Sequence, residues 1–289
     1  MFVENQSGWL RLALTPGLDF ELCFRLLKAF GLPEDIFNQR LSNLLPYVPQ
    51  NIALEIHRAP TEQISEKVQK IEQLIEKYPA VRLLVPSDKD FPSKFLSIPR
   101  PPLVTLCSGN LALLNSPTVS FLGSTHPTEE GVQIARSWAK ALAKKNAVFV
   151  QGDSLGIERE TLTAVRQTNP SALIIVARSL LDEQNFEAKL RFTTENGLLL
   201  CPLDGLDQPW QSRQKLLIAA TNHFVVIEAS IRSRILSVVR EAADVGRNVM
   251  AVPGSIYSPL SKGCHKLIRE GAKLVESIDE IEPEIKKSC

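Results

Sequence analysis

Short apolar runs alternate with longer helical patterns from about residue 103 to the C-terminus. The runs are apolar nearly throughout, as expected for strands that are covered on both faces of a sheet. Between them, apolar residues recur three or four positions apart, which is the spacing of one helical face. This alternation predicts an α/β fold with a mostly parallel, Rossmann-like sheet and right-handed crossovers. We predict strands at Thr118–Leu122, Ala147–Val150, Leu173–Ala177, Leu198–Cys201, Phe224–Glu228 and Asn248–Val252.

The first 85 residues have a helical pattern instead. One apolar stripe runs from Thr61 to Tyr78, and Pro79 ends it. The stripe consists of Ile64, Val68, Ile71 and Ile75. We therefore predict a small helical domain over residues 1–85 and an α/β domain over residues 86–289. The proline-rich stretch 86–102 would connect them, with Phe91 and Phe95 docking onto the second domain.

Composition narrows the class of protein. The chain has 289 residues, 44% hydrophobic and 22% charged, which suits a globular protein of two domains. The apolar runs are too short to span a membrane and the N-terminus lacks a secretion-signal pattern, so we expect a cytoplasmic protein without a membrane partner. Five cysteines and four histidines are scattered, so we expect neither a disulfide framework, a metal nor another cofactor. The net charge of +1 means that nucleic-acid binding would need a local basic patch.

Two glycine-containing loops follow predicted strands. Gly123, Ser124 and Thr125 follow the first strand, and Gly152 and Gly156 follow the second. Ligands of open parallel sheets bind at the carboxyl ends of the strands, where backbone amides and hydroxyls can hold an anion. Taken alone, the first loop fits a plain strand–turn–helix connection with an N-cap better than a ligand site. The pattern G-x-x-x-x-G-K-[ST] does not occur in the sequence, so a P-loop ATPase is unsupported.

Basic residues gather in three stretches near the ends of predicted strands. Spaced Lys and Arg side chains are what a phosphate backbone requires, although any one of them can be an ordinary surface charge. The stretches contain Arg213 and Lys215; Arg232, Arg234 and Arg240; and Lys262, His265, Lys266, Arg269 and Lys273. Aromatic partners for base stacking are sparse, and the nearby candidates are Trp210, His223 and Tyr257. Asp153 and Glu158 could form an acid–base pair, but a helix N-terminus attracts carboxylates on dipole grounds alone.

Several segments resemble the DprA/Smf (DNA processing protein A) family. The segment SRILSVVREAADVGRNVMAVPG at 233–254 is similar to the family's S-G-x-L-x-T-A…A-x-x-x-G-R-x-V-x-A-V-P-G block. The segment PLSKGCHKLIREGAKLV at 259–275 resembles G-x-x-x-L-I-x-x-G-A-x-L-V. Gly123-Ser124 stands where the family has G-S-R, and Gly152 with Gly156-Ile157-Glu158 where it has S-G-x-A-x-G-I-D. The resemblance covers nearly the whole chain.

The resemblance implies an extended Rossmann fold preceded by a sterile-alpha-motif-like domain. It also implies a homodimer formed through the C-terminal portion. The family function would be binding and protection of incoming single-stranded DNA during natural transformation and its delivery to the RecA recombinase, without catalysis or a cofactor. The expected DNA- and phosphate-binding residues are Gly123, Ser124, Thr125, Gly152, Gly156, Arg213, Lys215, Arg234 and Lys262.

The sequence also departs from the family pattern. Thr125 replaces the arginine of G-S-R, Gln151 the serine of the second loop, and Arg234 the glycine of S-G. The family's R-N-R is Arg213-Gln214-Lys215 here. Loss of a guanidinium removes a bidentate phosphate contact, which Arg234 could replace. Many members carry a C-terminal winged-helix domain, and we expect none after the α/β portion of this chain.

Two other functions stay open at this point. Nucleotide-processing hydrolases of the lysine-decarboxylase-like group share a Rossmann core, and Glu228 at a strand end could serve as an acid or base. Their P-G-G-x-G-T-x-x-E is present only as a fragment in Val252-Pro253-Gly254-Ser255. The chain could also be a scaffold whose DNA site has been eroded, given the substitutions at Thr125 and Gln151.

Overall fold

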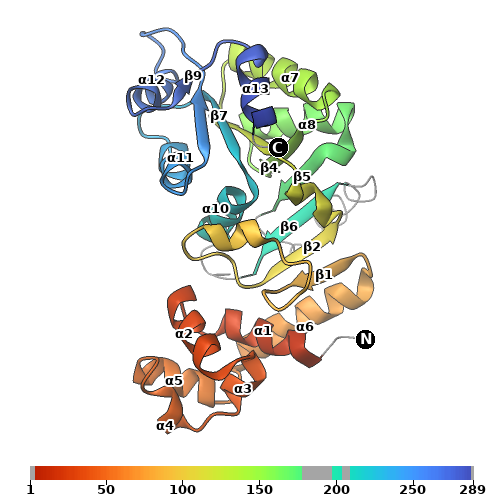
Figure 1. Cartoon of the computed structure of the whole chain (residues 1–289), viewed down its shortest axis with the longest axis vertical. Helices are drawn as coiled ribbons and strands as arrows, with labels where there is room; N and C mark the ends of the chain where they lie inside the picture. The colour runs from red at the N-terminus through yellow and green to blue at the C-terminus, as the bar shows by residue number, and fades with distance from the viewer. Residues whose placement is uncertain (1–3, 178–196, 204–208, 288–289) are drawn as a thin grey trace.

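A computed structural model describes residues 4–177, 197–203 and 209–287. Helices of the N-terminal part form one end of the molecule, and a sheet flanked by helices forms the rest (Figure 1). Helix α6 (Glu62–Lys77) begins after Thr61, whose hydroxyl accepts a hydrogen bond from the Ile64 amide, and its Ile64 and Ile71 side chains are buried. The predicted helix over this stretch is therefore confirmed. The other helices of this part are α1 (Glu4–Leu14), α2 (Phe20–Phe30), α3 (Pro33–Phe37), α4 (Leu41–Leu44) and α5 (Gln50–His57).

A nine-stranded sheet in the order β1-β2-β6-β5-β4-β3-β7-β8-β9 organises the remainder among the described residues. Strand pairs β1–β2 and β2–β6 are antiparallel, and all other pairs are parallel. The mostly parallel α/β fold predicted from the sequence is confirmed. The strands are β1 (Val81–Leu84), β2 (Thr105–Gly109), β3 (Thr118–Gly123), β4 (Val148–Gly152), β5 (Leu173–Val176), β6 (Leu198–Pro202), β7 (His223–Glu228), β8 (Asn248–Ala251) and β9 (Lys273–Leu274).

Three strands were missed by the sequence prediction. Val81–Leu84 falls inside the range 1–85 assigned to helices, but it pairs with β2 and forms one edge of the sheet, which corrects that assignment. β2 and the two-residue β9 are also additional. The expected docking of the proline-rich stretch is confirmed, because Phe95 is fully buried and its ring meets that of Phe91 edge to face.

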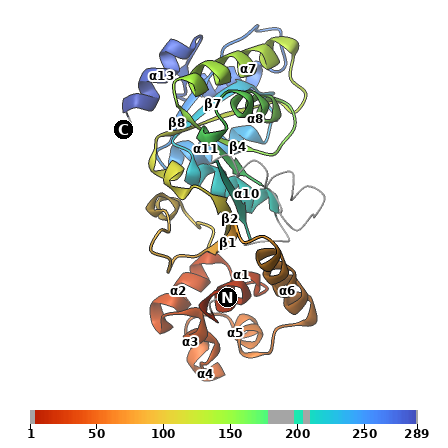
Figure 2. The same ribbon diagram turned by 90° about the vertical axis from the view of Figure 1, so that its right-hand side faces the viewer.

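Apolar side chains project from both faces of the central strands and form two hydrophobic cores among the described residues. Within β4, for example, Phe149 joins one core, while Val148 and Val150 join the other. The first core contains side chains of α7, α8 and α13 together with those of the N-terminal helices. The second contains side chains of α10, α11 and α12 and of the short helix η1. Figure 1 shows α10, α11 and α12 on one side of the strands and α7, α8 and α13 on the other, and Figure 2 looks onto the side that carries α7 and α8. The elements not yet given are α7 (Glu129–Lys144), α8 (Ile157–Thr168), α10 (Pro209–Ala220), α11 (Ile235–Asp244), α12 (Lys262–Arg269), α13 (Ile278–Lys287), η1 (Ser93–Ser97), η2 (Leu111–Asn115) and η3 (Pro170–Ala172).

The strand order creates a switch point beside β3. After β3 the chain continues through β4 and β5 on one side, whereas β7 and β8 lie on the other. The loops that follow β3 and β7 therefore diverge at the carboxyl edge and open a crevice, which is where open α/β sheets bind ligands. In the described part of the chain, each helix is too short or too polar to cross a bilayer.

Candidate nucleic-acid interface

A cavity of about 560 Å³ opens at this switch point, and we call it the rim pocket. Loops after β3, β4, β7 and β8 all contribute to it, together with the first turn of α10. Its lining residues are Gly123, Ser124, Thr125, His126, Ser154, Leu155, Glu158, Trp210, Ser230, Ser233, Arg234, Ile235 and Leu260. Of the predicted site residues, Gly123, Ser124, Thr125 and Arg234 thus meet in one cavity.

The glycines of the two predicted loops serve contacts inside the protein. Gly156 has φ +70°, and a Cβ there would lie 2.1 Å from the Ser124 carbonyl oxygen. The Ile157 amide donates to that same oxygen at 3.1 Å, so the β4–α8 loop packs directly on the β3–α7 loop. A Cβ on Gly123 would overlap Ile157, at 2.5 Å from its Cγ1, and one on Gly152 would overlap the Arg213 guanidinium. Gly152 and Gly156 therefore lie behind the pocket, whereas Gly123 lines it; the sequence prediction placed all three against a ligand.

Arg213 is buried beneath the second loop. Its exposed fraction is 1%, and its guanidinium donates to a Glu158 carboxylate oxygen at 2.6 Å and to the Val176 carbonyl oxygen at 3.2 Å. Asp153 completes the cluster, with 3.2 Å between its carboxylate and Arg213 Nε. This burial corrects the expectation that Arg213 offers its charge to a ligand. Instead, the ion pairs tie α10 to the start of α8 and hold the β4–α8 loop in place.

Hydroxyl groups dominate the polar lining of the rim pocket. They belong to Ser124, Thr125, Ser154, Ser230 and Ser233. Ser124 Oγ accepts a hydrogen bond from the His126 amide at 3.1 Å, and Thr125 Oγ1 lies 3.1 Å from His126 Nδ1. Ser154 Oγ is buried without a hydrogen-bond partner among the described residues. Ser154, Ser230 and Ser233 were missed as site residues, although their places after predicted strands could have indicated them.

Among the described residues that line the rim pocket, Arg234 is the only Lys or Arg, and it is exposed at the start of α11. Across the described residues, no carboxylate forms an ion pair with it. Lys262 is exposed at the start of α12 but does not line the pocket. The next residue, Gly263, donates its amide to the Ala229 carbonyl oxygen at 2.7 Å, which places Lys262 near the end of β7. The available cations therefore lie on the β7–β8 side of the pocket.

Lys215 lies at a different cavity, where the helical part meets the α/β part. This cavity of about 260 Å³ is lined by Phe20, Arg100 and Lys215 among others. Lys215 forms an ion pair with Glu241, and burial, together with the nearby Arg100 charge, lowers the pKa of its ammonium group. Gln211 and Ser212 line this cavity, whereas Trp210 lines the rim pocket. The first turn of α10 thus separates Lys215 from the predicted phosphate site.

The groups considered for acid–base chemistry are engaged by neighbours. Glu228 accepts hydrogen bonds from the Thr128 amide at 3.0 Å and from the Thr128 hydroxyl, and so it helps to cap α7. Glu158 and Asp153 pair with Arg213. Burial raises the pKa of the Cys264 thiol to about 11, so it is protonated at neutral pH. Within the described ranges, no three His, Cys, Asp or Glu side chains are arranged to hold a metal ion.

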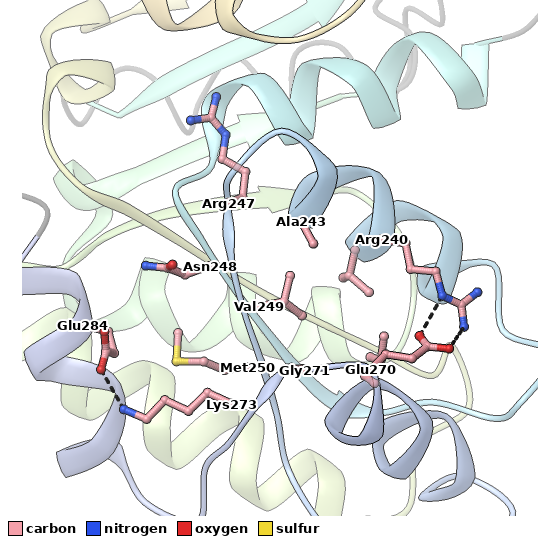
Figure 3. A pocket seen from close by; sticks show the side chains of 13 residues that line it. Arg240, Ala243, Arg247, Asn248, Val249, Met250, Glu270, Gly271, Lys273 and Glu284 are labelled. Carbon is pink, nitrogen blue, oxygen red and sulfur yellow. Dashed lines mark hydrogen bonds and ion pairs between the residues drawn. The ribbon is translucent and has the colours of Figure 1, made fainter.

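A second cavity lies along the β8–β9 end of the sheet, and we call it the edge pocket (Figure 3). Its volume is about 410 Å³. Arg240 meets Glu270 through two nitrogen–oxygen contacts of 2.9 and 3.0 Å, and Lys273 donates to Glu284 at 2.8 Å. Both pairs are drawn in Figure 3, where the Arg247 side chain points away from the centre of the pocket. Two of its lining cations, Arg240 and Lys273, are thus neutralised by carboxylates, and a third, Arg247, donates to the Ser97 hydroxyl at 2.9 Å.

The three aromatic candidates have very different surroundings. His223 is fully buried in β7, so it cannot stack on a base, which corrects its place among the candidates. Trp210 is half-buried in the rim pocket, with its ring 5.4 Å from the Arg213 guanidinium carbon. Tyr257 is 89% exposed in the loop after β8.

Comparison with known proteins identifies the family of this chain. The family model described as DNA recombination-mediator protein A matches residues 82–286. DNA processing protein DprA of Streptococcus pneumoniae is 31% identical over 209 residues, which cover 70% of this chain and 72% of that protein. Protein Smf of Synechocystis is 25% identical over 294 residues, which cover 96% of this chain and 72% of the relative.

Solved structures support the same fold. The structure of DNA processing protein A from Streptococcus pneumoniae aligns with a TM-score of 0.70 at 23% identity, covering 98% of this chain and 99% of that one. DNA processing protein A from Helicobacter pylori, described with its single-stranded DNA binding mode, aligns with a TM-score of 0.59 at 24% identity, covering 72% of this chain and 96% of that one. The family model spans most of the chain, and a relative above 30% identity agrees with it. The chain therefore belongs to the DNA recombination-mediator protein A family.

Proposed function

We propose that this protein binds single-stranded DNA, with a backbone phosphate held in the rim pocket. The observation that carries the proposal is the position of Arg234, which is exposed and forms no ion pair with a described residue, among five hydroxyl-bearing residues at the switch point of the sheet. Hydroxyls and a guanidinium are groups that donate to phosphate oxygens. The buried Arg213 does not contact DNA in this proposal, and Lys262 adds charge just outside the pocket.

The wider role follows the family. We propose a non-catalytic, cytoplasmic DNA-processing protein of natural transformation that protects incoming single strands and delivers them to a RecA-type recombinase. Engagement of Glu228, Glu158 and Asp153 by neighbouring residues supports a binding role over the hydrolase alternative. We further propose a homodimer formed through the C-terminal α/β portion. Its support is the short β9, which pairs only with Met250 and Ala251, so that Asn248 and Val249 of β8 pair with β7 on one side and with no described strand on the other.

The test compares two arginines that are two residues apart. Arg234 lines the rim pocket, whereas Arg232 is also exposed and does not line it. We expect Arg234→Ala to weaken binding of an oligothymidylate and to make the slope of log affinity against log salt less steep by about 0.7, the loss of one phosphate contact to a single strand. Fluorescence anisotropy titrations at several salt concentrations measure both quantities.

Arg232→Ala is the matched control, because it removes the same charge from the same loop. It should leave the affinity close to that of the wild type. If the two substitutions had equal effects, general surface charge would account for DNA binding, and the proposed phosphate site would be refuted. A wild-type protein that binds no oligonucleotide at physiological salt would instead favour a scaffold with an eroded DNA site.

A further inference from the structure

Large apolar side chains are exposed on three loops around the rim pocket. Leu155 follows β4, Ile231 follows β7, and Ile256 and Tyr257 follow β8. The ends of these parallel strands lie at one edge of the sheet, so the loops share the edge that carries the pocket. Several large apolar side chains exposed on neighbouring loops are the kind of surface on which a ligand can pack. Tyr257 is the most exposed of them, at 89%, and Ile256 follows at 64%.

The loop that carries Tyr257 is fixed at both ends. Near its start, His265 Nε2 lies 3.3 Å from the Gly254 amide nitrogen and 3.0 Å from the Gly254 carbonyl oxygen. At its other end, the Leu260 carbonyl oxygen accepts a hydrogen bond from the Ala229 amide at 2.7 Å. Leu260 itself lines the rim pocket. The tip is therefore presented beside the pocket by an anchored loop, which lowers the ordering cost of a contact.

The charge around this tip suits a polyanion. The segment 252–262 carries no acidic residue, and it ends with Lys262. On the next loop, Arg234 lines the pocket without a carboxylate partner among the described residues. An exposed aromatic ring beside a cationic groove is the combination with which proteins hold unpaired nucleotides, because every base offers a face for stacking.

We infer that Tyr257, supported by Ile256, is a stacking platform for a base of the DNA strand whose phosphate occupies the rim pocket. This inference rests on the function proposed above and deepens it. The other aromatic candidates are less suited, since His223 is buried and Trp210 is half-buried beside Arg213. The platform recognises unpaired bases without preference for one sequence, and it excludes a base that remains inside a duplex.

The experiment separates base stacking from phosphate binding. Two probes of equal length are used, an oligothymidylate and an oligonucleotide of abasic sites with the same backbone. Tyr257→Ala and Tyr257→Leu should each weaken binding of the oligothymidylate about tenfold, within the range for loss of one base–aromatic stack. Tyr257→Phe keeps the ring and should bind as the wild type does. None of the three should change binding of the abasic probe.

Arg234→Ala is the control for the proposed function, because it should weaken binding of both probes. If that variant weakens both probes and the Tyr257 variants bind oligothymidylate normally, the platform is refuted and the phosphate site stands. If the wild type binds neither probe, the phosphate site fails as well. Light scattering decides between DNA and a second copy of the chain: conversion of a dimer to a monomer by Tyr257→Ala would assign the loop to a subunit contact and overturn the inference. The side chain is almost wholly exposed, so all three variants should fold.

Discussion

The two sides of the rim pocket are built differently. On the β3–β4 side, Gly156 packs against Ser124, and the Arg213 ion pairs are buried beneath the loop. On the β7–β8 side, Arg234 and Tyr257 are exposed, and their side chains are not committed to a neighbour in the described structure. One side therefore fixes the shape of the pocket, and the other offers groups to a ligand. A charge that sequence similarity assigns to binding can thus serve structure, as the buried Arg213 does.

The largest effect should come from removing the buried guanidinium. Arg213→Met leaves Glu158 buried and without its partner at 2.6 Å, and breaking a buried pair from one side costs about 3 kcal/mol or more. We expect the free energy of unfolding, measured by urea denaturation, to fall by that amount. The salt dependence of oligonucleotide binding by the folded variant should stay close to that of the wild type, since Arg213 is not a phosphate contact.

Arg234→Met is the control on the other side of the pocket. It should change the unfolding free energy by less than about 0.5 kcal/mol, as exposed substitutions usually do. A double variant, Arg213→Met with Glu158→Gln, should recover part of the lost stability, because Glu158, the more deeply buried of the two carboxylates that pair with Arg213, then carries no charge. If Arg213→Met left stability intact but flattened the salt dependence, the assignment of the two sides would be reversed.

The sequence predicted the sheet well because buried parallel strands are apolar along their whole length. β5 (Leu173–Val176) was found from its run of apolar residues alone. β9 could not be found in this way, since Lys273 and Leu274 are both exposed and the strand exists only through pairing with β8. β1 was missed because its four residues directly follow a long helix and are too few to show a period of their own.

The candidate site was predicted only in part, for a different reason. The loops at the strand ends were located correctly, and Ser124, Thr125 and Arg234 do line one cavity. Which arginine faces outward depends on helix phase and on partners far away in the sequence. Arg213 meets Glu158 across 55 residues, and no local pattern indicates that pair. Periodicity finds elements, whereas burial of a charged side chain is decided by their packing.

A smaller effect is expected from Gly156→Ala on the first side. The backbone there has φ +70° and ψ −131°, a conformation that side chains disfavour, and the new Cβ would meet the Ser124 carbonyl oxygen. We expect a loss of about 2 kcal/mol in unfolding free energy. We also expect weaker oligonucleotide binding, because the new Cβ would push the β3–α7 and β4–α8 loops apart and displace Ser124.

Gly246→Ala is the matched control, since Gly246 also has a positive φ of 78° but would place its Cβ in open space. It isolates the effect of backbone strain. We expect it to lower the free energy of unfolding by about 1 kcal/mol and to leave oligonucleotide binding unchanged. Equal losses of unfolding free energy in the two variants would mean that the contact between the loops adds nothing to stability.

The smallest effect should come from Lys262→Ala on the second side. Lys262 is exposed beside the pocket without lining it, so its contribution is long-range attraction of the strand, screened within about 10 Å at 0.1 M salt. We expect a two- to threefold loss of affinity, on the order of the smallest exposed charge–charge effects, at low salt and none at high salt. Lys144→Ala removes the same charge from the last turn of α7. That helix starts at the rim, and its 16 residues carry Lys144 about 20 Å away. Lys144→Ala should therefore leave the affinity unchanged at every salt concentration. If the two lysines behaved alike, attraction would be spread over the whole surface, and the β7–β8 side would owe its role to Arg234 and Tyr257 alone.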